Sequence, residues 1–349
     1  MNIKEMEKTA RENLKGYCRV CPECDGYACQ GEVPGMGGVG TASAFKANVA
    51  DLKNVKLKLR TIHDVKDPDM GFDFFGETLD FPIITAPVTG SVYNMGGALS
   101  EREYIQSAVQ GSIEAGTIAM AGDSADLTMY QDGLWALENA DGKGCCIIKP
   151  RSNREILRNL KEAEKAGAKA VGVDIDGAGL ITMSLKGQPV GPKTKEELKQ
   201  LITSTKLPFI LKGVMTPDEA ELAVEVGAKA IVVSNHGGRV LDHAESSMKV
   251  LPEISKRVKG KIMVLADGGV RSGVDAFKMI ALGADAVLVG RPVVIGAFGA
   301  FSHGVRMVLD EMKNQLYQSM ILTGSADLKG IDEEKIVFDS IDRRIRELK

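Results

Sequence analysis

Three short phrases in this chain follow one pattern, in which a glycine ends a helix-like stretch and an alanine opens an apolar run. They occupy residues 166–170, 226–230 and 282–286. Such a glycine can take the left-handed conformation that stops a helix, and the alanines after it begin buried strands. The repeated phrase predicts that helices and strands alternate, as they do in parallel α/β folds.

Short apolar runs recur from about residue 80 onward, and amphipathic stretches separate them. The expected strands are 82–86, 117–120, 145–149, 170–174, 208–212, 230–234, 262–267 and 286–290. The expected helices include 154–166, 217–226 and 273–282. Eight evenly spaced units favour a (β/α)8 TIM barrel over a doubly wound sheet. We therefore expect a barrel domain at 79–349 and an N-terminal extension at 1–78, with a helix near 4–14.

Composition narrows the class of partner. The formal net charge of −3 argues against nucleic acid or anionic lipid as the main partner. No apolar run approaches the roughly 20 residues of a membrane helix, and residues 1–7 lack the apolar core of a signal peptide. We therefore expect a cytoplasmic protein whose six cysteines are thiols or metal ligands rather than disulfides.

Polar and ionisable residues end most of the expected strands. Barrel active sites form at the carboxyl ends of the strands, so these residues are candidates for the functional site. They are Lys149, Asp174, Lys212, Ser234 with His236, Asp267 and Arg291.

Residues 234–239 read Ser-Asn-His-Gly-Gly-Arg and follow the sixth expected strand. His236 and Arg239 thus stand three residues apart on a glycine-rich loop. An imidazole base and a guanidinium clamp are the two groups needed to take a proton from a carbon beside a carboxylate. A polar turn with a structural histidine is the alternative interpretation.

The loops after the seventh and eighth expected strands combine glycine with arginine. Glycines let backbone amides approach an anion, and these two loops usually hold phosphate in barrels. We therefore predict a phosphate-anchored cofactor. No G-x-G-x-x-G run opens a βαβ unit, which disfavours a Rossmann-bound NAD. The residues concerned are Asp267, Gly268, Gly269, Arg271, Gly290 and Arg291.

These stretches together resemble the FMN-dependent α-hydroxy-acid oxidase/dehydrogenase family, which includes glycolate oxidase, lactate oxidase and flavocytochrome b2. The resemblance rests on 85–89, 211–214, 217–220, 234–242, 267–284 and 287–292. It implies the same barrel, bound FMN, and oxidation of a small 2-hydroxy acid such as lactate to the 2-oxo acid. It also implies a homo-oligomer, either a tetramer or an octamer, and leaves the electron acceptor open.

The resemblance implies roles by position. His236 would take the substrate proton, Asp174 would pair with its imidazolium, and Arg239 would bind the carboxylate. If Asp174 pairs with the ring, we expect the pKa of His236 to move upward. Lys212 would lie beside N1 and O2 of the flavin and complete the catalytic set. The implied flavin-binding residues are Ala86, Pro87, Val88, Thr89, Gly122, Lys212, Ser234, Asp267, Gly268, Gly269, Arg271, Gly290 and Arg291.

Three departures from the family pattern concern the substrate side. The family has Gln-x-Tyr where this chain reads Ile147-Ile148-Lys149. Residues 176–181 supply no second carboxylate-binding arginine, and no tyrosine stands near 34–36. Lys149 is a substitute candidate for binding the substrate carboxylate as a point charge.

Four cysteines fall within twelve residues as C-x2-C-x2-C-x4-C, outside the family pattern. We call Cys18, Cys21, Cys24 and Cys29 the four-cysteine site. Closely spaced thiols in a cytoplasmic protein suggest a metal, either zinc or an iron–sulfur cluster, although free thiols are the alternative. Cys145 and Cys146 lie on an expected strand and are read as core thiols.

Three function classes remain open from the sequence. The leading one is FMN-dependent oxidation of a 2-hydroxy acid. A redox-neutral FMN isomerase, similar to type 2 isopentenyl-diphosphate isomerase, shares the barrel, but its typical motifs do not include the 234–239 segment. A flavin- and metal-binding electron-transfer subunit is the third class, and the missing tyrosines and arginine keep it open.

Overall fold

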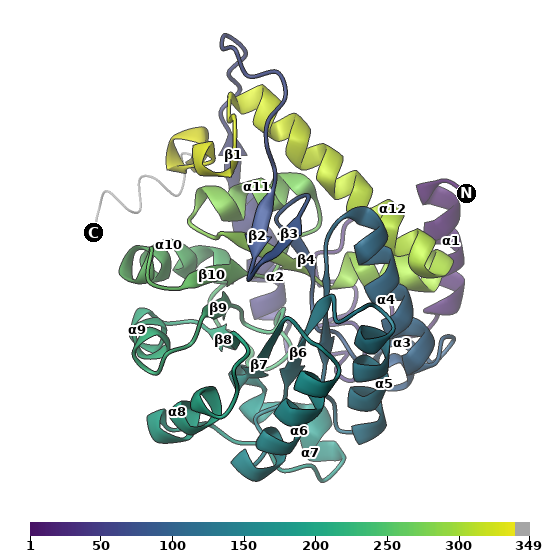
Figure 1. Cartoon of the computed structure of the whole chain (residues 1–349). Coiled ribbons are helices and arrows are strands. Elements are labelled where there is room, and N and C mark those ends of the chain that lie inside the picture. The colour runs from purple at the N-terminus through teal and green to yellow at the C-terminus, as the bar shows by residue number, and fades with distance from the viewer. Residues whose placement is uncertain (339–349) are drawn as a thin grey trace.

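Eight parallel strands close into a barrel in the computed structural model, which describes residues 1–338 (Figure 1). Neighbouring strands follow one another around the barrel in chain order, from β4 to β11, and β11 pairs with β4 through Val287 and Ile83. The strands are β4 (Ile83–Thr85), β5 (Ala119–Gly122), β6 (Gly144–Ile148), β7 (Ala170–Asp174), β8 (Phe209–Val214), β9 (Ala230–Val233), β10 (Met263–Ala266) and β11 (Ala286–Val289). The predicted barrel is therefore confirmed; β7 has the expected bounds, and the other strand ends lie within two residues of the expected ones.

Helices separate the strands along the chain and surround the barrel (Figure 1). They are α3 (Ser91–Met95), α4 (Glu101–Ala115), α5 (Leu127–Glu138), α6 (Asn153–Lys165), α7 (Ile181–Leu185), α8 (Lys195–Thr203), α9 (Pro217–Glu225), α10 (Ser247–Val258), α11 (Gly273–Ala281) and α12 (Arg291–Thr323). Residues 339–349, at the end of the predicted barrel domain, lie outside the described residues.

Local sequence signals explain where these helices begin and end. Gly167, Gly227 and Gly283 have φ values of +77°, +92° and +109°, the left-handed conformation that the repeated phrase predicts. At the other end, Ser152 accepts a hydrogen bond from the backbone N–H of Glu155, whose side chain returns to the Ser152 backbone. This capping box satisfies two amide groups that the first turn of α6 leaves unpaired.

Two apolar layers make up the core. Side chains such as Ile84, Met120 and Leu265 fill the barrel interior, and a larger outer layer packs the strands against the helices. Cys145 belongs to the inner layer and Cys146 to the outer one, and both are fully buried, as core thiols should be. Because successive strand residues face opposite sides, each strand contributes to both layers.

The N-terminal segment covers part of the barrel. Helix α1 (Ile3–Asn13) packs along α12 (Figure 1). A long loop leads to α2 (Ser43–Asn54), and β1 (Val55–Leu57) pairs with β12 (Ile336–Phe338) near the end of the described chain. The hairpin of β2 (Phe72–Phe74) and β3 (Glu77–Leu79) directly precedes the barrel. The boundary expected at residue 78 falls within β3, one residue before this hairpin ends.

Helix α12 is long and apolar enough to meet a membrane-span criterion, with a mean hydropathy of 1.4 over its most apolar window. This differs from the sequence expectation, which considered only unbroken apolar runs. Half of that window is buried, and the helix packs against α1, α4 and α11. It is also interrupted by non-helical backbone at Ala300 and Phe301. We therefore interpret α12 as the last helix of the barrel.

Candidate active site

One cavity lies at the carboxyl ends of the strands, where the predicted site residues gather. Segments from the strand-end loops and from residues 35–36 of the N-terminal extension form its wall. Its lining includes Ala86, Pro87, Val88, Thr89, Lys149, Lys212, His236, Arg239, Asp267, Gly268, Gly269, Arg271, Gly290 and Arg291. Residues from strands far apart in the sequence thus meet at one mouth of the barrel, as the fold requires.

His236 is held in an unusual backbone conformation directly after β9. Its φ is +58°, a left-handed value that costs a non-glycine residue roughly 1 kcal/mol or more. The backbone N–H of His236 donates to Oγ of Ser234 at 3.1 Å, which fixes the turn. The side chain lines the cavity and is largely buried. Strain at a cavity wall is typical of a functional residue.

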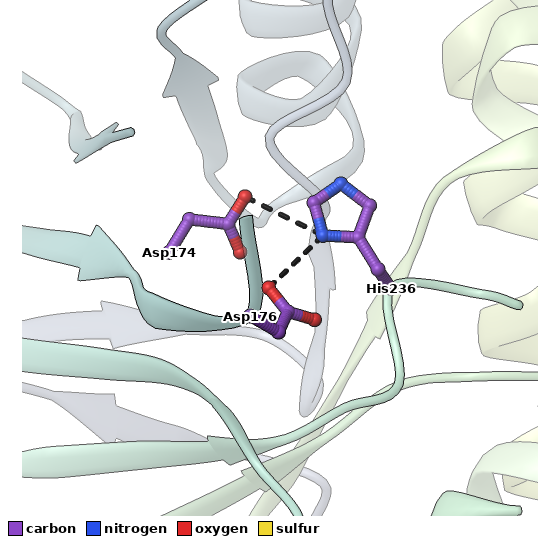
Figure 2. A group of neighbouring side chains, drawn as sticks. All are labelled: Asp174, Asp176 and His236. Atoms are coloured by element: carbon purple, nitrogen blue, oxygen red, sulfur yellow. Dashed lines mark hydrogen bonds and ion pairs between the residues drawn. The ribbon is translucent and has the colours of Figure 1, made fainter. Parts of the chain in front are cut away.

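The closest partner of the His236 imidazole is Asp176. Nδ1 of His236 lies 3.0 Å from Oδ1 of Asp176 and 3.5 Å from Oδ2 of Asp174 (Figure 2). The sequence-based expectation that Asp174 is the partner is therefore only partly right. Asp176 lies in the 3-10 turn Ile175–Gly179 after β7, which brings its carboxylate back toward the ring. Figure 2 shows the other ring nitrogen directed away from both carboxylates.

Asp174 instead anchors two lysines. Its carboxylate accepts hydrogen bonds from Nζ of Lys149 and, at 3.1 Å, from Nζ of Lys212. Lys212 also donates to Oγ of Ser234 at 3.2 Å and lies 3.8 Å from Asp267. The side chains of Lys149, Asp174, Lys212 and Asp267 are all nearly buried. Each can stay charged there only because an opposite charge lies beside it.

The surroundings of Asp174 and Asp176 shift the pKa values of these two carboxylates in opposite directions. Burial opposes the charge of Asp174, but His236 and the two lysines outweigh it and hold the Asp174 pKa well below its usual range. Burial, and then the charge of Asp174, raise the pKa of Asp176 well above its usual range. Burial, assisted by Lys149 and Lys212, lowers the pKa of His236 well below its usual value, although Asp174 opposes this. Asp174 thus acts on the His236 pKa in the upward direction expected from the sequence, but burial and the two lysines outweigh it and make the net shift downward.

The ligand atoms of Asp174, Asp176 and His236 lie within 4.8 Å of one another, close enough to hold a cation. The ammonium groups of Lys149 and Lys212 already occupy the same carboxylate of Asp174. We therefore interpret the group as a proton-handling site rather than a metal site.

The far part of the cavity has unsatisfied polar groups that fit a phosphorylated cofactor. Oδ1 of Asp267 and Nη2 of Arg271 are buried without a hydrogen-bond partner within the described chain. Gly268 and Gly269 lie in the loop between Asp267 and Arg271 and have φ values of +95° and +83°. A Cβ on Gly269 would collide with the backbone oxygen of Asn48. An acceptor and a donor left open in a glycine-lined cavity suit a ribityl hydroxyl and a phosphate.

Two arginines, Arg271 and Arg291, lie over the same Phe45 ring at this end of the cavity. The guanidinium of Arg291 stacks 3.8 Å from the ring centre of Phe45, and that of Arg271 lies 5.5 Å from the same ring. Burial, and then the charge of Arg271, lower the pKa of Arg291. An anion between these groups would relieve both the burial cost and the repulsion.

Arg239 reaches the cavity beside the N-terminal extension. Its guanidinium donates to the backbone oxygens of Gly35 and Gly37 and, at 3.1 Å, to Oδ1 of Asn94. Asn94 lies in α3 and was not singled out from the sequence, because no motif marks it. Arg239 thus lines the cavity, and its contacts with Gly35, Gly37 and Asn94 already use part of the hydrogen-bonding capacity of its guanidinium.

Other predicted residues lie behind the cavity wall. Gly122 ends β5, and a Cβ there would collide with Thr89 and the Pro87 carbonyl, so it supports that loop from below. Ser234 is fully buried and contacts Lys212 and His236 rather than lining the cavity. The four-cysteine site lies outside the main cavity and lines a neighbouring smaller one, described below.

Comparison with known proteins supports the site. A family model described as FMN-dependent dehydrogenase matches residues 35–186 and 180–338. The chain belongs to this family. It is 31% identical over 336 residues to a 2-hydroxyacid oxidase 2 of Bos taurus, covering 87% of this chain and 93% of that protein. It is 30% identical over 336 residues to an L-lactate oxidase of Nostoc sp., covering 85% and 90%.

Solved structures of the same family have the same fold. A mandelate oxidase variant with 2-hydroxy-phenylacetamide superposes with a TM-score of 0.76 at 28% identity, covering 94% of this chain and 96% of that one. Another mandelate oxidase variant, with the monooxide FMN adduct, superposes with a TM-score of 0.72 at 30% identity, covering 90% of this chain and 99% of that one. This FMN-dependent dehydrogenase is therefore an enzyme of the 2-hydroxy-acid oxidase and dehydrogenase kind, and FMN is its cofactor. The isomerase alternative is not favoured.

Proposed function

We propose that this enzyme oxidises a small 2-hydroxy acid to the 2-oxo acid with His236 as the base and Arg239 as the carboxylate clamp. The observation that carries the proposal is the position of the imidazole. Nδ1 of His236 is taken by Asp176, while the opposite nitrogen is directed away from both carboxylates (Figure 2). A carboxylate on Nδ1 selects the tautomer that leaves Nε2 free to accept a proton.

Charge balance supports that tautomer. The ammonium groups of Lys149 and Lys212 both pair with the carboxylate of Asp174, so its charge is balanced without a charged imidazole. The lowered pKa of His236 keeps the ring neutral, so Nε2 is a proton acceptor before substrate binds. When His236 takes the proton, Asp176 and Asp174 stabilise the resulting imidazolium from the Nδ1 side.

FMN supplies the electron-accepting ring when bound. Its phosphate would be held by Arg271 and Arg291, and its ribityl chain by Asp267. Ala86 to Thr89 and Lys212 line the part of the cavity that the ring would occupy. Lys212 would place an ammonium beside the ring, where a positive charge favours the anionic reduced form.

The substrate clamp differs from the family pattern, and Lys149 fills part of the gap. Lys149 lines the cavity, and its ammonium has donors beyond the one given to Asp174. Together with Arg239 it offers two positive charges for one carboxylate. Leu180, Thr182 and Met36 complete a wall of modest polarity, which suits a small hydroxy acid.

Anaerobic mixing with a panel of 2-hydroxy acids tests the proposal. Loss of the oxidised-flavin absorbance with one acid, accompanied by formation of its 2-oxo acid, is the expected result. Each acid should be presented as separate enantiomers, because a fixed clamp and base distinguish them. A protein whose bound FMN is bleached by dithionite but by no acid in the panel would favour the electron-transfer class instead.

A further inference from the structure

All four members of the four-cysteine site line one small cavity beside the flavin cavity. The loop that carries them lies between α1 and α2, and each cysteine is half-buried. None forms a disulfide in the structure. The four thiols are neither in the core nor fully exposed. A metal centre bound to them would therefore be partly shielded from solvent and still close enough to the surface to exchange electrons with another protein.

The backbone of this loop is shaped around the sulfurs. Val20 has a φ of +45°, and its N–H donates to Sγ of Cys18 at 3.4 Å. Gly26 has a φ of +88°, and a Cβ there would meet the ring of Phe45 at 2.8 Å. A backbone amide that donates to a cysteine sulfur, as Val20 does, is one of the means by which proteins set the reduction potential of an iron–sulfur cluster.

The two cavities share a wall. Met36 and Arg291 line both the flavin cavity and the cavity of the four-cysteine site. Nε of Arg271, the other phosphate-end arginine, donates to the backbone oxygen of Cys24 at 3.3 Å. A centre held by the four thiolates would thus lie next to the bound cofactor, with Arg291 as a counter-charge.

Spacing and geometry favour an iron–sulfur cluster over zinc. The C-x2-C-x2-C run matches the first three ligands of a ferredoxin-type cluster, while the fourth spacing is longer by one residue and no proline follows Cys29. Zinc sites usually pair two C-x2–4-C knuckles that are well separated in the sequence. Tetrahedral zinc with Zn–S bonds of about 2.3 Å brings sulfurs to roughly 3.8 Å from one another. Within the described chain, no three of the four sulfurs lie within 4.8 Å of one another. The close tetrahedral grouping of a zinc site is thus not formed by these sulfurs.

We infer that the four-cysteine site binds an iron–sulfur cluster and that this cluster is the exit for substrate electrons. The role as an exit rests on the proposed function, whereas the metal binding does not. Oxidation of one 2-hydroxy acid releases two electrons and two protons. His236 would take one proton, and the reduced flavin would hold the two electrons with the other proton. The cluster changes by one electron at a time, so it would pass the two electrons singly from the flavin to a one-electron carrier protein, and the second proton would be released as the flavin is reoxidised.

Elemental analysis of the anaerobically purified full-length protein tests the site directly. About four iron atoms and four acid-labile sulfides per chain are expected, with an electron paramagnetic resonance signal after dithionite reduction. The Cys24→Ser/Cys29→Ser double variant should lose iron, sulfide and signal while keeping FMN. Cys145→Ala, in the barrel interior, is the matched control and should keep all of them. Zinc in place of iron, or wild-type protein free of both, overturns the inference.

The electron-exit role has its own measurement. Adding the active hydroxy acid anaerobically should produce the cluster signal in the wild type, and in the double variant it should bleach only the flavin. Bleaching without any cluster signal in iron-loaded wild type overturns the exit role. Failure of the acid to bleach either protein would count against the proposed function and leave the iron and sulfide result standing. If the double variant does not fold, the wild-type iron and sulfide content decides the site.

Discussion

His236 and Asp176 form a hydrogen-bonded pair in which Nδ1 lies 3.0 Å from Oδ1, while Asp174, two residues earlier, binds Lys149 and Lys212. Two carboxylates on one strand end thereby have different tasks. Under the proposed function, Asp176 would orient the base, and Asp174 would fix the ammonium groups of Lys149 and Lys212.

Replacement of the orienting carboxylate tests this division. Asp176→Asn should slow flavin reduction by about 10- to 100-fold, the value of a charge-assisted hydrogen bond of roughly 1.5–3 kcal/mol. FMN content should not change, because Asp176 does not line the cofactor cavity. Rapid mixing of variant and wild type measures the rate, and exposed Asp218→Asn is the control. An Asp176→Asn enzyme with the wild-type rate and pH profile would show that Asp174 alone supports the histidine.

Loss of the base itself should have a larger effect. His236→Ala should retain FMN and reduce it with the hydroxy acid about 10²–10⁴-fold more slowly, the usual contribution of a positioned base. Stopped-flow absorbance of the flavin measures the rate, and dithionite reduction of the same variant confirms that the flavin is competent. Unchanged reduction in His236→Ala would assign proton removal to another group, with Lys149 the first to test.

The pH dependence follows from the lowered pKa of His236. The neutral ring is the active form, and a lowered pKa means that this form persists to more acidic pH. The rate of flavin reduction in the free enzyme should therefore rise through an apparent pKa below about 6.5 and stay level through neutral pH. A profile rising only above pH 7 would contradict the structure.

Arg271 has a buried donor with no partner in the described chain, which makes it the sharpest test of phosphate binding. Arg271→Ala should weaken FMN binding by about 10- to 100-fold, because a phosphate loses a charge-assisted hydrogen bond. Equilibrium dialysis or flavin fluorescence measures the dissociation constant. Arg257→Ala, at an exposed ion pair with Glu221, should leave FMN affinity unchanged. Equal affinities for both variants would remove Arg271 from the phosphate site.

The clamp residue should affect substrate binding more than chemistry. Arg239→Lys keeps one positive charge but loses the planar fork, so KM should rise about 10-fold or more with a smaller change in kcat. Steady-state kinetics with the active hydroxy acid separates the two constants. A variant with unchanged KM would indicate that the contacts of Arg239 with Gly35 and Gly37 are its whole role.

The order of strands and helices was predictable from the sequence because its signals are local. Gly167, Gly227 and Gly283 stop helices by their own backbone freedom, and each strand is an apolar run that needs no distant partner to be seen. The gathering of His236, Lys212 and Asp267 at one cavity was also predictable. Once a parallel barrel is inferred, all strand ends meet at one mouth.

Only the tertiary structure decided which groups pair within that mouth. The 3-10 turn after β7 carries Asp176 to His236, and strand pairing places Asp174 opposite Lys212, so the nearer carboxylate is not the one that motif position suggests. The contact of Arg239 with Gly35 joins residues about two hundred positions apart. Burial then sets the direction of each pKa shift, because desolvation depends on everything packed around a charge and on no single stretch of sequence.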